Sequence, residues 1–107
     1  MGGVALFVYG TLMDEERLAQ LSGRRFPRRR AALEGFARVL AAHGYPTIVP
    51  KPGGRVEGVL VEGVDAASLA ALDAYEDAGR LYGRRPAEVL VDGEHVACEV
   101  YVSLTPR

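Results

Sequence analysis

Glu76 is the acidic residue whose place in the sequence best fits acid–base chemistry. It falls near the end of a predicted helix over Asp65–Asp77, whose apolar side is marked by Leu69 and Leu72. At about 100° per residue, Glu76 lies between these two leucines on the apolar stripe, and Asp73 lies on its flank. A carboxylate directed at a core is costly unless it is paired or faces a cavity, and burial raises its pKa. Such a group can act first as a general base and then as an acid.

Two structural alternatives apply to Glu76. The helix could fray at its end and turn the side chain into water, or Arg80 or Arg84 could neutralise the carboxylate. An ion pair of that kind would hold the pKa down and leave a structural role only.

A second candidate for chemistry is the segment Y-G-T-L, which comprises Tyr9, Gly10, Thr11 and Leu12. Gly10 has no Cβ, so the chain can turn sharply there and a ligand can approach the backbone. Backbone N–H groups that leave a strand and precede a helix lack partners, and they can bind an anion such as a carboxylate. An ordinary strand-to-helix turn would show the same pattern.

Tyrosines form a third group of candidates. Tyr45, Tyr75, Tyr82 and Tyr101 each offer an apolar ring with one polar tip. That combination fits the wall of a pocket for a small polar ligand, and it fits a barrel core equally well.

Other catalytic and cofactor motifs are missing from the sequence. His43 and His95 are far apart and have no ligand-pair spacing, and no phosphate loop, dinucleotide fingerprint or G-x-S-x-G occurs. Cys98, the single cysteine, lies in the apparent strand V-A-C-E-V and is interpreted as a buried structural thiol, with a nucleophile as the alternative. We expect neither a metal nor a cofactor.

The elements that must position these residues begin with a buried strand over Val4–Val8. Asp14 is a candidate N-cap of a short helix that Gly23 ends, with Leu18 and Leu21 facing inward.

The segment 31–42 is expected to be extended around Gly35, with an Ala-rich helix as a competitor. Segment 43–54 is rich in Pro and Gly, which excludes a helix and suits an irregular or edge segment.

In the second half, Val56–Val64 is Val-rich and alternating, which predicts a strand. After the helix over Asp65–Asp77, which Gly79 ends, two more strands are expected over Val89–Val91 and Val96–Val102. A D-G turn joins them into a hairpin, with His95 in the turn. This order of elements favours a mixed α+β domain over βαβ units.

Composition narrows the function classes. The 107 residues fit one domain over 1–107, and a net charge of −1 argues against a dominant nucleic-acid or membrane partner. The arginine-rich stretch 24–30 is interpreted as a solvated loop leading into a strand, with an anion or RNA patch as the alternative. With one cysteine and neither a signal peptide nor a bilayer-spanning stretch, a cytoplasmic protein is expected. The oligomeric state is left open.

Four segments, in order, carry a family resemblance: V-Y-G-T-L-M at Val8–Met13, G-Y-P-T-I-V-P at Gly44–Pro50, V-E-G-V-L at Val56–Leu60 and L-D-A-Y-E-D-A-G-R-L-Y at Leu72–Tyr82. Together they resemble the γ-glutamylcyclotransferase and AIG2-like family over nearly the whole chain. The motif Y-G-T-L is nearer the AIG2-like and γ-glutamylamine branch than the Y-G-S-N-L of glutathione-pathway members.

The resemblance implies a small mixed β-barrel with flanking helices, in which the motif loop and the glutamate meet at one cavity. It implies that Tyr9, Gly10, Thr11 and Leu12 hold the substrate carboxylate and that Glu76 is the general base and acid. The residues expected to line the same pocket are Tyr82, Tyr45 and Tyr101.

The expected substrate is a small γ-glutamyl amide. Its α-amine would attack its own γ-carbonyl and release 5-oxoproline and a free amine or amino acid, without a cofactor. A non-catalytic small-molecule-binding domain on the same scaffold is the alternative, because a fold does not dictate chemistry.

Overall fold

The computed structural model describes residues 3–76 and 79–104. Within them the elements follow in this order: β1 (Val4–Val8), η1 (Thr11–Met13), α1 (Glu15–Ser22), β2 (Arg28–Leu40), β3 (Pro46–Val64), α2 (Ala66–Tyr75), β4 (Tyr82–Val91) and β5 (Glu94–Ser103).

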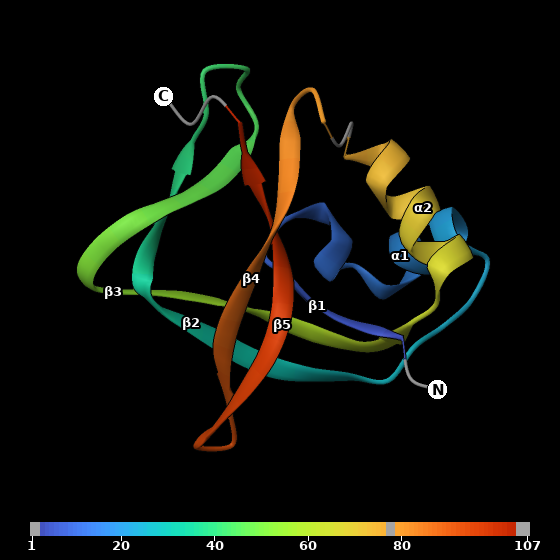
Figure 1. The fold of residues 1–107 in the computed structure, drawn as a ribbon, viewed down its shortest axis with the longest axis horizontal. Helices are drawn as coiled ribbons and strands as arrows, with labels where there is room; N and C mark the ends of the chain where they lie inside the picture. The colour runs from blue at the N-terminus through green and yellow to red at the C-terminus, as the bar shows by residue number, and fades with distance from the viewer. Residues whose placement is uncertain (1–2, 77–78, 105–107) are drawn as a thin grey trace.

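The strands pair in the order β1-β3-β2-β4-β5 and close into a small barrel. Closure occurs because β1 pairs with β3 in the antiparallel sense and with β5 in the parallel sense. Helices α1 and α2 lie next to each other on one side of the barrel (Figure 1). The predicted mixed α+β architecture with flanking helices is confirmed.

Strand β1 explains why its whole sequence is apolar. Leu6 and Val8 pack into the cluster beneath the helices, together with Leu72, whereas Phe7 and Tyr9 pack into the barrel interior. Successive side chains of a strand point to opposite faces, so a strand between two cores is apolar at every position. The strand predicted over Val4–Val8 is confirmed with these bounds.

Strand β2 confirms the extended conformation predicted around Gly35 and excludes the helical competitor. Gly35 has φ 84°, and the pairing register with β3 shifts between Glu34 and Phe36. A residue without Cβ adopts this conformation without strain, so the strand can bend there without ending.

Strand β3 is longer than the sequence indicated. Segment 43–54 was expected to be either irregular or an edge segment, and the structure has an edge strand there: β3 starts at Pro46 and runs unbroken to Val64. Its first residues pair with β2 from Leu40 back to Phe36, and pairing with β1 begins only at Val59. That first part is therefore an edge, where proline is tolerated because no ladder donor is lost.

The last hairpin also starts earlier than expected. Strand β4 begins at Tyr82, seven residues before the predicted start at Val89, because it pairs with β5 along its whole length. Asp92 and Gly93 form the predicted turn with φ of 50° and 81°. His95 was expected in this turn but is the second residue of β5.

Both predicted helix starts are confirmed by side-chain caps. Asp14 accepts a hydrogen bond from the Glu16 amide, and Asp65 accepts one from the Ser68 amide. The second helix ends at Tyr75 with Glu76 as its C-cap, and Asp77 lies outside the described residues. No helix in the described ranges is long and apolar enough to cross a membrane.

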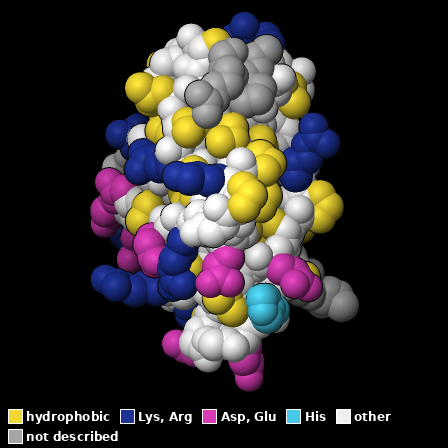
Figure 2. All heavy atoms as spheres, turned by 90° about the vertical axis from the view of Figure 1, so that its left-hand side faces the viewer, with side chains coloured by type: hydrophobic (Ala, Val, Ile, Leu, Met, Phe, Trp, Pro, Cys, Tyr) yellow, Lys and Arg dark blue, Asp and Glu magenta, His cyan; other side chains and the backbone are white. Residues whose placement is uncertain are grey.

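The arginine-rich stretch 24–30 is only partly a loop, because Arg28–Arg30 already belong to β2. Several of its side chains form ion pairs: Arg24 with Asp65 at 2.9 Å, Arg25 with Glu16 at 2.7 Å and Arg29 with Glu62 at 2.8 Å. Such pairs reduce the positive charge available to an external anion. Acidic and basic side chains are also mixed on the face drawn in Figure 2.

Candidate active site

One cavity of about 400 Å³ opens where the end of β1, the start of β3 and the end of α2 meet the β4–β5 hairpin. This volume is in the usual range for small-molecule sites. Its lining residues come from all of these elements: Phe7, Val8, Tyr9, Gly10, Thr11, Leu12, Tyr45, Pro46, Ala74, Tyr75, Glu76, Leu81, Tyr82 and Tyr101. Every residue that the sequence nominated for catalysis or substrate binding lies in this set, and their roles stay predictions.

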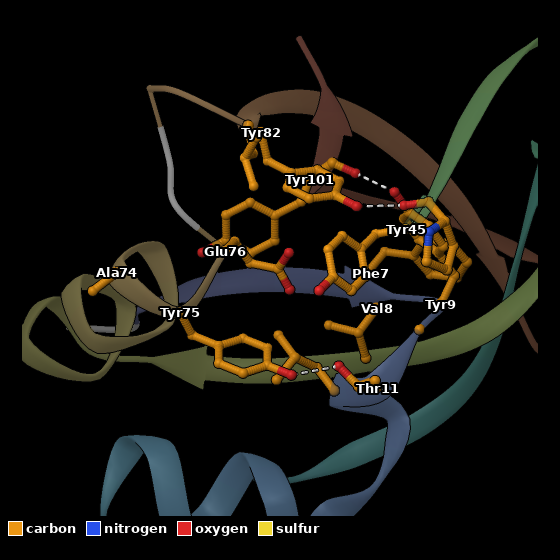
Figure 3. Close-up of a pocket in the computed structure, with 14 residues that line it drawn as sticks. Phe7, Val8, Tyr9, Thr11, Tyr45, Ala74, Tyr75, Glu76, Tyr82 and Tyr101 are labelled. Atoms are coloured by element: carbon orange, nitrogen blue, oxygen red, sulfur yellow. Dashed lines mark hydrogen bonds between the residues drawn. The ribbon is translucent and has the colours of Figure 1, made fainter. Parts of the chain in front are cut away.

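The Glu76 side chain is directed into this cavity (Figure 3). Its carboxylate makes no hydrogen bond or ion pair with another described residue, and burial raises its pKa from 4.5 to about 7. Arg84, one of the two arginines considered as alternative partners, binds Asp73 and Glu99 instead. An uncompensated, half-buried carboxylate in a cavity can accept and return a proton near neutral pH.

The loop after β1 faces Glu76 across the cavity with free donors. The first turn of η1 is closed by the Met13 amide, which donates to the Gly10 carbonyl at 3.0 Å. The amides of Thr11 and Leu12 precede that bond and donate to no other described residue. A Cβ on Gly10 would meet no atom within 4 Å, so the backbone is open to a ligand there.

Leu12 lines the cavity, but the residue as a whole is only 2% exposed. Its side chain packs beneath the helices, in the cluster that includes Leu18 and Leu72. The side chain therefore anchors the loop, and the expectation that Leu12 helps to hold a substrate carboxylate applies to its amide.

The tyrosine rings of the cavity wall are fixed by their hydroxyl groups. Tyr9 donates to the Tyr101 carbonyl at 2.5 Å, Tyr82 to the Pro46 carbonyl at 2.6 Å and Tyr101 to Asp73 at 2.5 Å. Burial raises the pKa of Tyr82 to about 12 and those of Tyr9 and Tyr101 still further. These phenols therefore stay neutral while Glu76 titrates, and they serve both core and cavity.

Tyr45 and Tyr75 flank the cavity nearer to the solvent. Tyr45 is 61% exposed, and its amide donates to Nδ1 of His43 at 3.3 Å, so the Nε2 proton faces Ser103 Oγ at 3.1 Å. The Tyr75 hydroxyl lies 2.9 Å from Thr11 Oγ1 (Figure 3). That hydrogen bond joins the end of α2 to the free-amide loop.

The sequence did not nominate Phe7, although the residue is among those that surround the cavity. A Cβ on Gly58 would lie 2.7 Å from this ring and 2.4 Å from the Val8 carbonyl oxygen. Gly58 is the glycine of V-E-G-V-L, so that motif marks the place where the Phe7 ring crosses β3. A glycine in the interior of a predicted strand was the available signal.

Cys98 is placed away from the cavity. It is buried in the barrel interior, and burial raises the pKa of its thiol to about 11. The thiol is therefore protonated at neutral pH, which fits the structural interpretation and gives no support to a nucleophile. In the described part of the chain, no three His, Cys, Asp or Glu side chains are grouped as metal ligands would be.

Residues 6–107 match the family model described as gamma-glutamyl cyclotransferase, AIG2-like. The chain belongs to this family. AIG2-like protein C of Arabidopsis thaliana is 37% identical over 91% of this chain and 57% of that protein. Protein AIG2 C of the same plant is 34% identical over 91% of this chain and 59% of the relative. The chain thus spans somewhat less than three fifths of these curated family members.

Solved structures support the same membership. An AIG2-like protein from Mus musculus superposes with a TM-score of 0.81 at 30% identity, covering 98% of this chain and 80% of the mouse chain. A gamma-glutamyl cyclotransferase superposes with a TM-score of 0.82 over 97% of this chain and 70% of its own. Its identity of 21% makes that likeness evidence of the shared fold alone.

Proposed function

We propose that this domain is a cyclotransferase that releases 5-oxoproline from a small γ-glutamyl amide. The observation that carries the proposal is one cavity that joins an unpaired carboxylate, Glu76, to a loop with free backbone amides. The substrate is a zwitterion at one end, and these two groups match its α-ammonium and its α-carboxylate. Family membership supports the same chemistry.

In the proposed reaction, Glu76 takes one proton from the α-ammonium, because only the neutral amine is a nucleophile. The nitrogen attacks the γ-carbonyl carbon, a C–N bond forms and the ring closes. Protonated Glu76 then gives its proton to the amide nitrogen, and the original C–N bond breaks. The second proton lost by the ring nitrogen ends on the released amine, which leaves as an ammonium ion.

The amides of Thr11 and Leu12 would hold the α-carboxylate and so fold the substrate with its amine beside its own γ-carbonyl. Holding two reacting groups of one molecule in attack geometry supplies a large part of the rate gain. The neutral phenols of Tyr9, Tyr82 and Tyr101 would close the walls without competing for the proton.

The charges of the cavity-lining residues also indicate which kind of leaving group the site would accept. Among the described lining residues, Glu76 is the one with an ionisable carboxyl or basic side chain, and no Arg, Lys or His is present. A γ-glutamyl dipeptide brings a further carboxylate that would meet no cation there, and a γ-glutamyl amine does not. This favours γ-glutamyl amines as the substrate class.

The test is a 5-oxoproline assay with matched γ-glutamyl amines and γ-glutamyl dipeptides. The wild-type protein is expected to turn over the amines, with kcat/KM rising as Glu76 loses its proton through about pH 7. Glu76→Gln should lose at least 100-fold in kcat, at the lower end of what general acid–base catalysis contributes. Glu88→Gln, an exposed carboxylate outside the cavity, is the control. Full turnover by Glu76→Gln would show that the base is wrongly assigned.

A non-catalytic binding domain is the second candidate. The tyrosine hydroxyl groups of the cavity wall already have hydrogen-bond partners within the protein, so they are not available as further catalytic groups. A thermal shift assay with 5-oxoproline and the same γ-glutamyl compounds separates the two. Stabilisation without any release of 5-oxoproline would favour binding alone.

A further inference from the structure

A polar cluster behind the cavity wall ties the last turn of α2 to the β4–β5 hairpin. The Arg84 guanidinium donates to both oxygens of Asp73, from Nε at 2.8 Å and from Nη2 at 3.1 Å. The Tyr101 hydroxyl donates to the same carboxylate at 2.5 Å, and Arg84 also donates to Glu99. The Arg84 and Asp73 side chains are 29% and 26% exposed. A two-point, partly desolvated pair fixes geometry more strongly than a surface ion pair.

This cluster acts on the part of α2 that carries Glu76. Asp73 precedes Glu76 by three residues, and Glu76 is the C-cap, so the helix supports it from one side only. The direction of the Glu76 side chain therefore depends on where the last helical turn is held. Tyr101 links the two places directly, because it lines the cavity with Glu76 (Figure 3) while its hydroxyl donates to Asp73.

We propose that Asp73, held by Arg84, is a positioning residue that keeps Glu76 directed into the cavity. Neither side chain lines the cavity, so neither is given a chemical step. Without the cluster, the end of α2 would separate from β4 and β5, and Glu76 would turn toward water. The catalytic part of this proposal rests on the proposed function, but the geometric part does not.

A purely stabilising role is the alternative, and the same helix supplies the control for it. At the other end of α2, Asp65 caps the Ser68 amide and pairs with Arg24 at 2.9 Å. Asp65→Ala removes the N-cap and an ion pair from α2 far from Glu76, and so destabilises the helix without touching its last turn. It should lower the melting temperature and leave the Glu76 carboxyl where it is.

The first experiment follows the titration of Glu76 by NMR of its side-chain carboxyl carbon, assigned with Glu76→Gln. The groups facing Glu76 from β1, β4 and β5 are the phenols of Tyr9, Tyr82 and Tyr101, which stay neutral over the range. Solvation of a displaced carboxyl lowers its pKa. We expect Asp73→Asn and Arg84→Gln both to lower the pKa of Glu76. In Asp65→Ala the pKa of Glu76 should be the same as in the wild type.

Charge effects alone predict a different pattern. Removing the Asp73 anion would lower the pKa of Glu76, whereas removing the Arg84 cation would raise it. Shifts in opposite directions, or no shift in either variant, would overturn the proposal. If Asp73→Asn fails to fold, Tyr101→Phe takes its place, because it removes one hydrogen bond of Asp73 with no change of charge.

The second experiment measures turnover well below the melting temperature of each variant. Asp73→Asn and Arg84→Gln should each lower kcat about tenfold or more with little change in KM, because a small misplacement of a catalytic group is costly. The kcat of the double variant should be no lower than that of either single variant. Arg84→Lys should retain more kcat than Arg84→Gln but less than the wild type, since lysine lacks the two-point fork of arginine. If the wild type releases no 5-oxoproline, the proposed function fails, and the NMR titration still decides the positioning role.

Discussion

At the scale of single residues, the burial of Glu76 makes the stability of the fold depend on pH. Its pKa in the folded protein, about 7, lies above the ordinary value of 4.5, so the folded state binds the proton more tightly than the unfolded chain. That stabilising contribution is fully present below pH 4.5 and is lost as the pH rises through 7. Ionised Glu76 therefore destabilises the fold at alkaline pH, and the proposed catalytic role would account for keeping such a group in the cavity.

Glu76→Gln should consequently be more stable than the wild type at pH 8, with the difference vanishing near pH 4. We expect a gain of about 1–2 kcal/mol, less than the full shift implies, because the half-buried carboxylate is partly screened by water. Thermal unfolding at both pH values measures it. Exposed Glu88→Gln should show no such pH-dependent gain, and equal stability of Glu76→Gln and wild type at pH 8 would contradict the buried carboxylate.

The hydrogen bond between Thr11 and Tyr75 is a second feature of residue scale. Tyr75→Phe removes it from an exposed site, so the stability loss should stay below about 1 kcal/mol. The free-amide loop would lose its link to α2, and KM should rise several-fold. Steady-state kinetics of Tyr75→Phe, Thr11→Val and the double variant check this. Additive effects of the two changes would show that the hydrogen bond does not couple them.

At the scale of elements, the crossing of β1 over β3 depends on Gly58. A methyl group there would lie 2.4 Å from the Val8 carbonyl oxygen and 2.7 Å from the Phe7 ring. One is backbone and the other a fully buried ring, so neither can move freely. Gly58→Ala should cost about 1–3 kcal/mol, as overpacked cores do, and should push the Phe7 ring toward the cavity.

Denaturant unfolding measures the cost, and Gly83→Ala in β4 is the matched control. A methyl group on Gly83 would meet only the Leu104 side chain, at 3.1 Å, which can rotate away. A Gly58→Ala protein as stable as Gly83→Ala would show that the crossing has room to adjust.

At the scale of the whole molecule, the barrel is closed unevenly. Strands β4 and β5 pair along their full length, and β2 pairs with β3 almost throughout, whereas β2 meets β4 at the single pair Ala32–Leu90. Few ladder hydrogen bonds hold that seam, so it should open at lower free energy than the two hairpins.

Native-state hydrogen exchange tests this unevenness. Amides of β4 that pair with β5 should approach the protection of global unfolding, and the β2–β4 seam near Ala32 should exchange through local opening. Amides shared by β2 and β3 on either side of Gly35 serve as the internal reference. Equal protection of the seam and the hairpins would mean that the barrel unfolds as one unit.

Much of the fold and the candidate site follows from local sequence. The strand at Val4–Val8, the caps at Asp14 and Asp65 and the turn at Asp92–Gly93 are set by neighbouring residues, so they could be predicted. The inward position of Glu76 follows from helical periodicity in the same way. The resemblance placed the remaining site residues around one cavity, where the structure has them.

What the sequence could not determine depends on pairing between distant segments. The start of β3 at Pro46 and of β4 at Tyr82 is decided by partner strands, which override the local Pro, Gly and Arg residues. Two contacts arise only when the barrel closes: the packing of the Phe7 ring over Gly58 and the hydrogen bonds from Arg84 to Asp73. Periodicity assigns a side chain to a face, but only tertiary contacts choose its neighbour, and with it the surroundings of the Glu76 carboxyl.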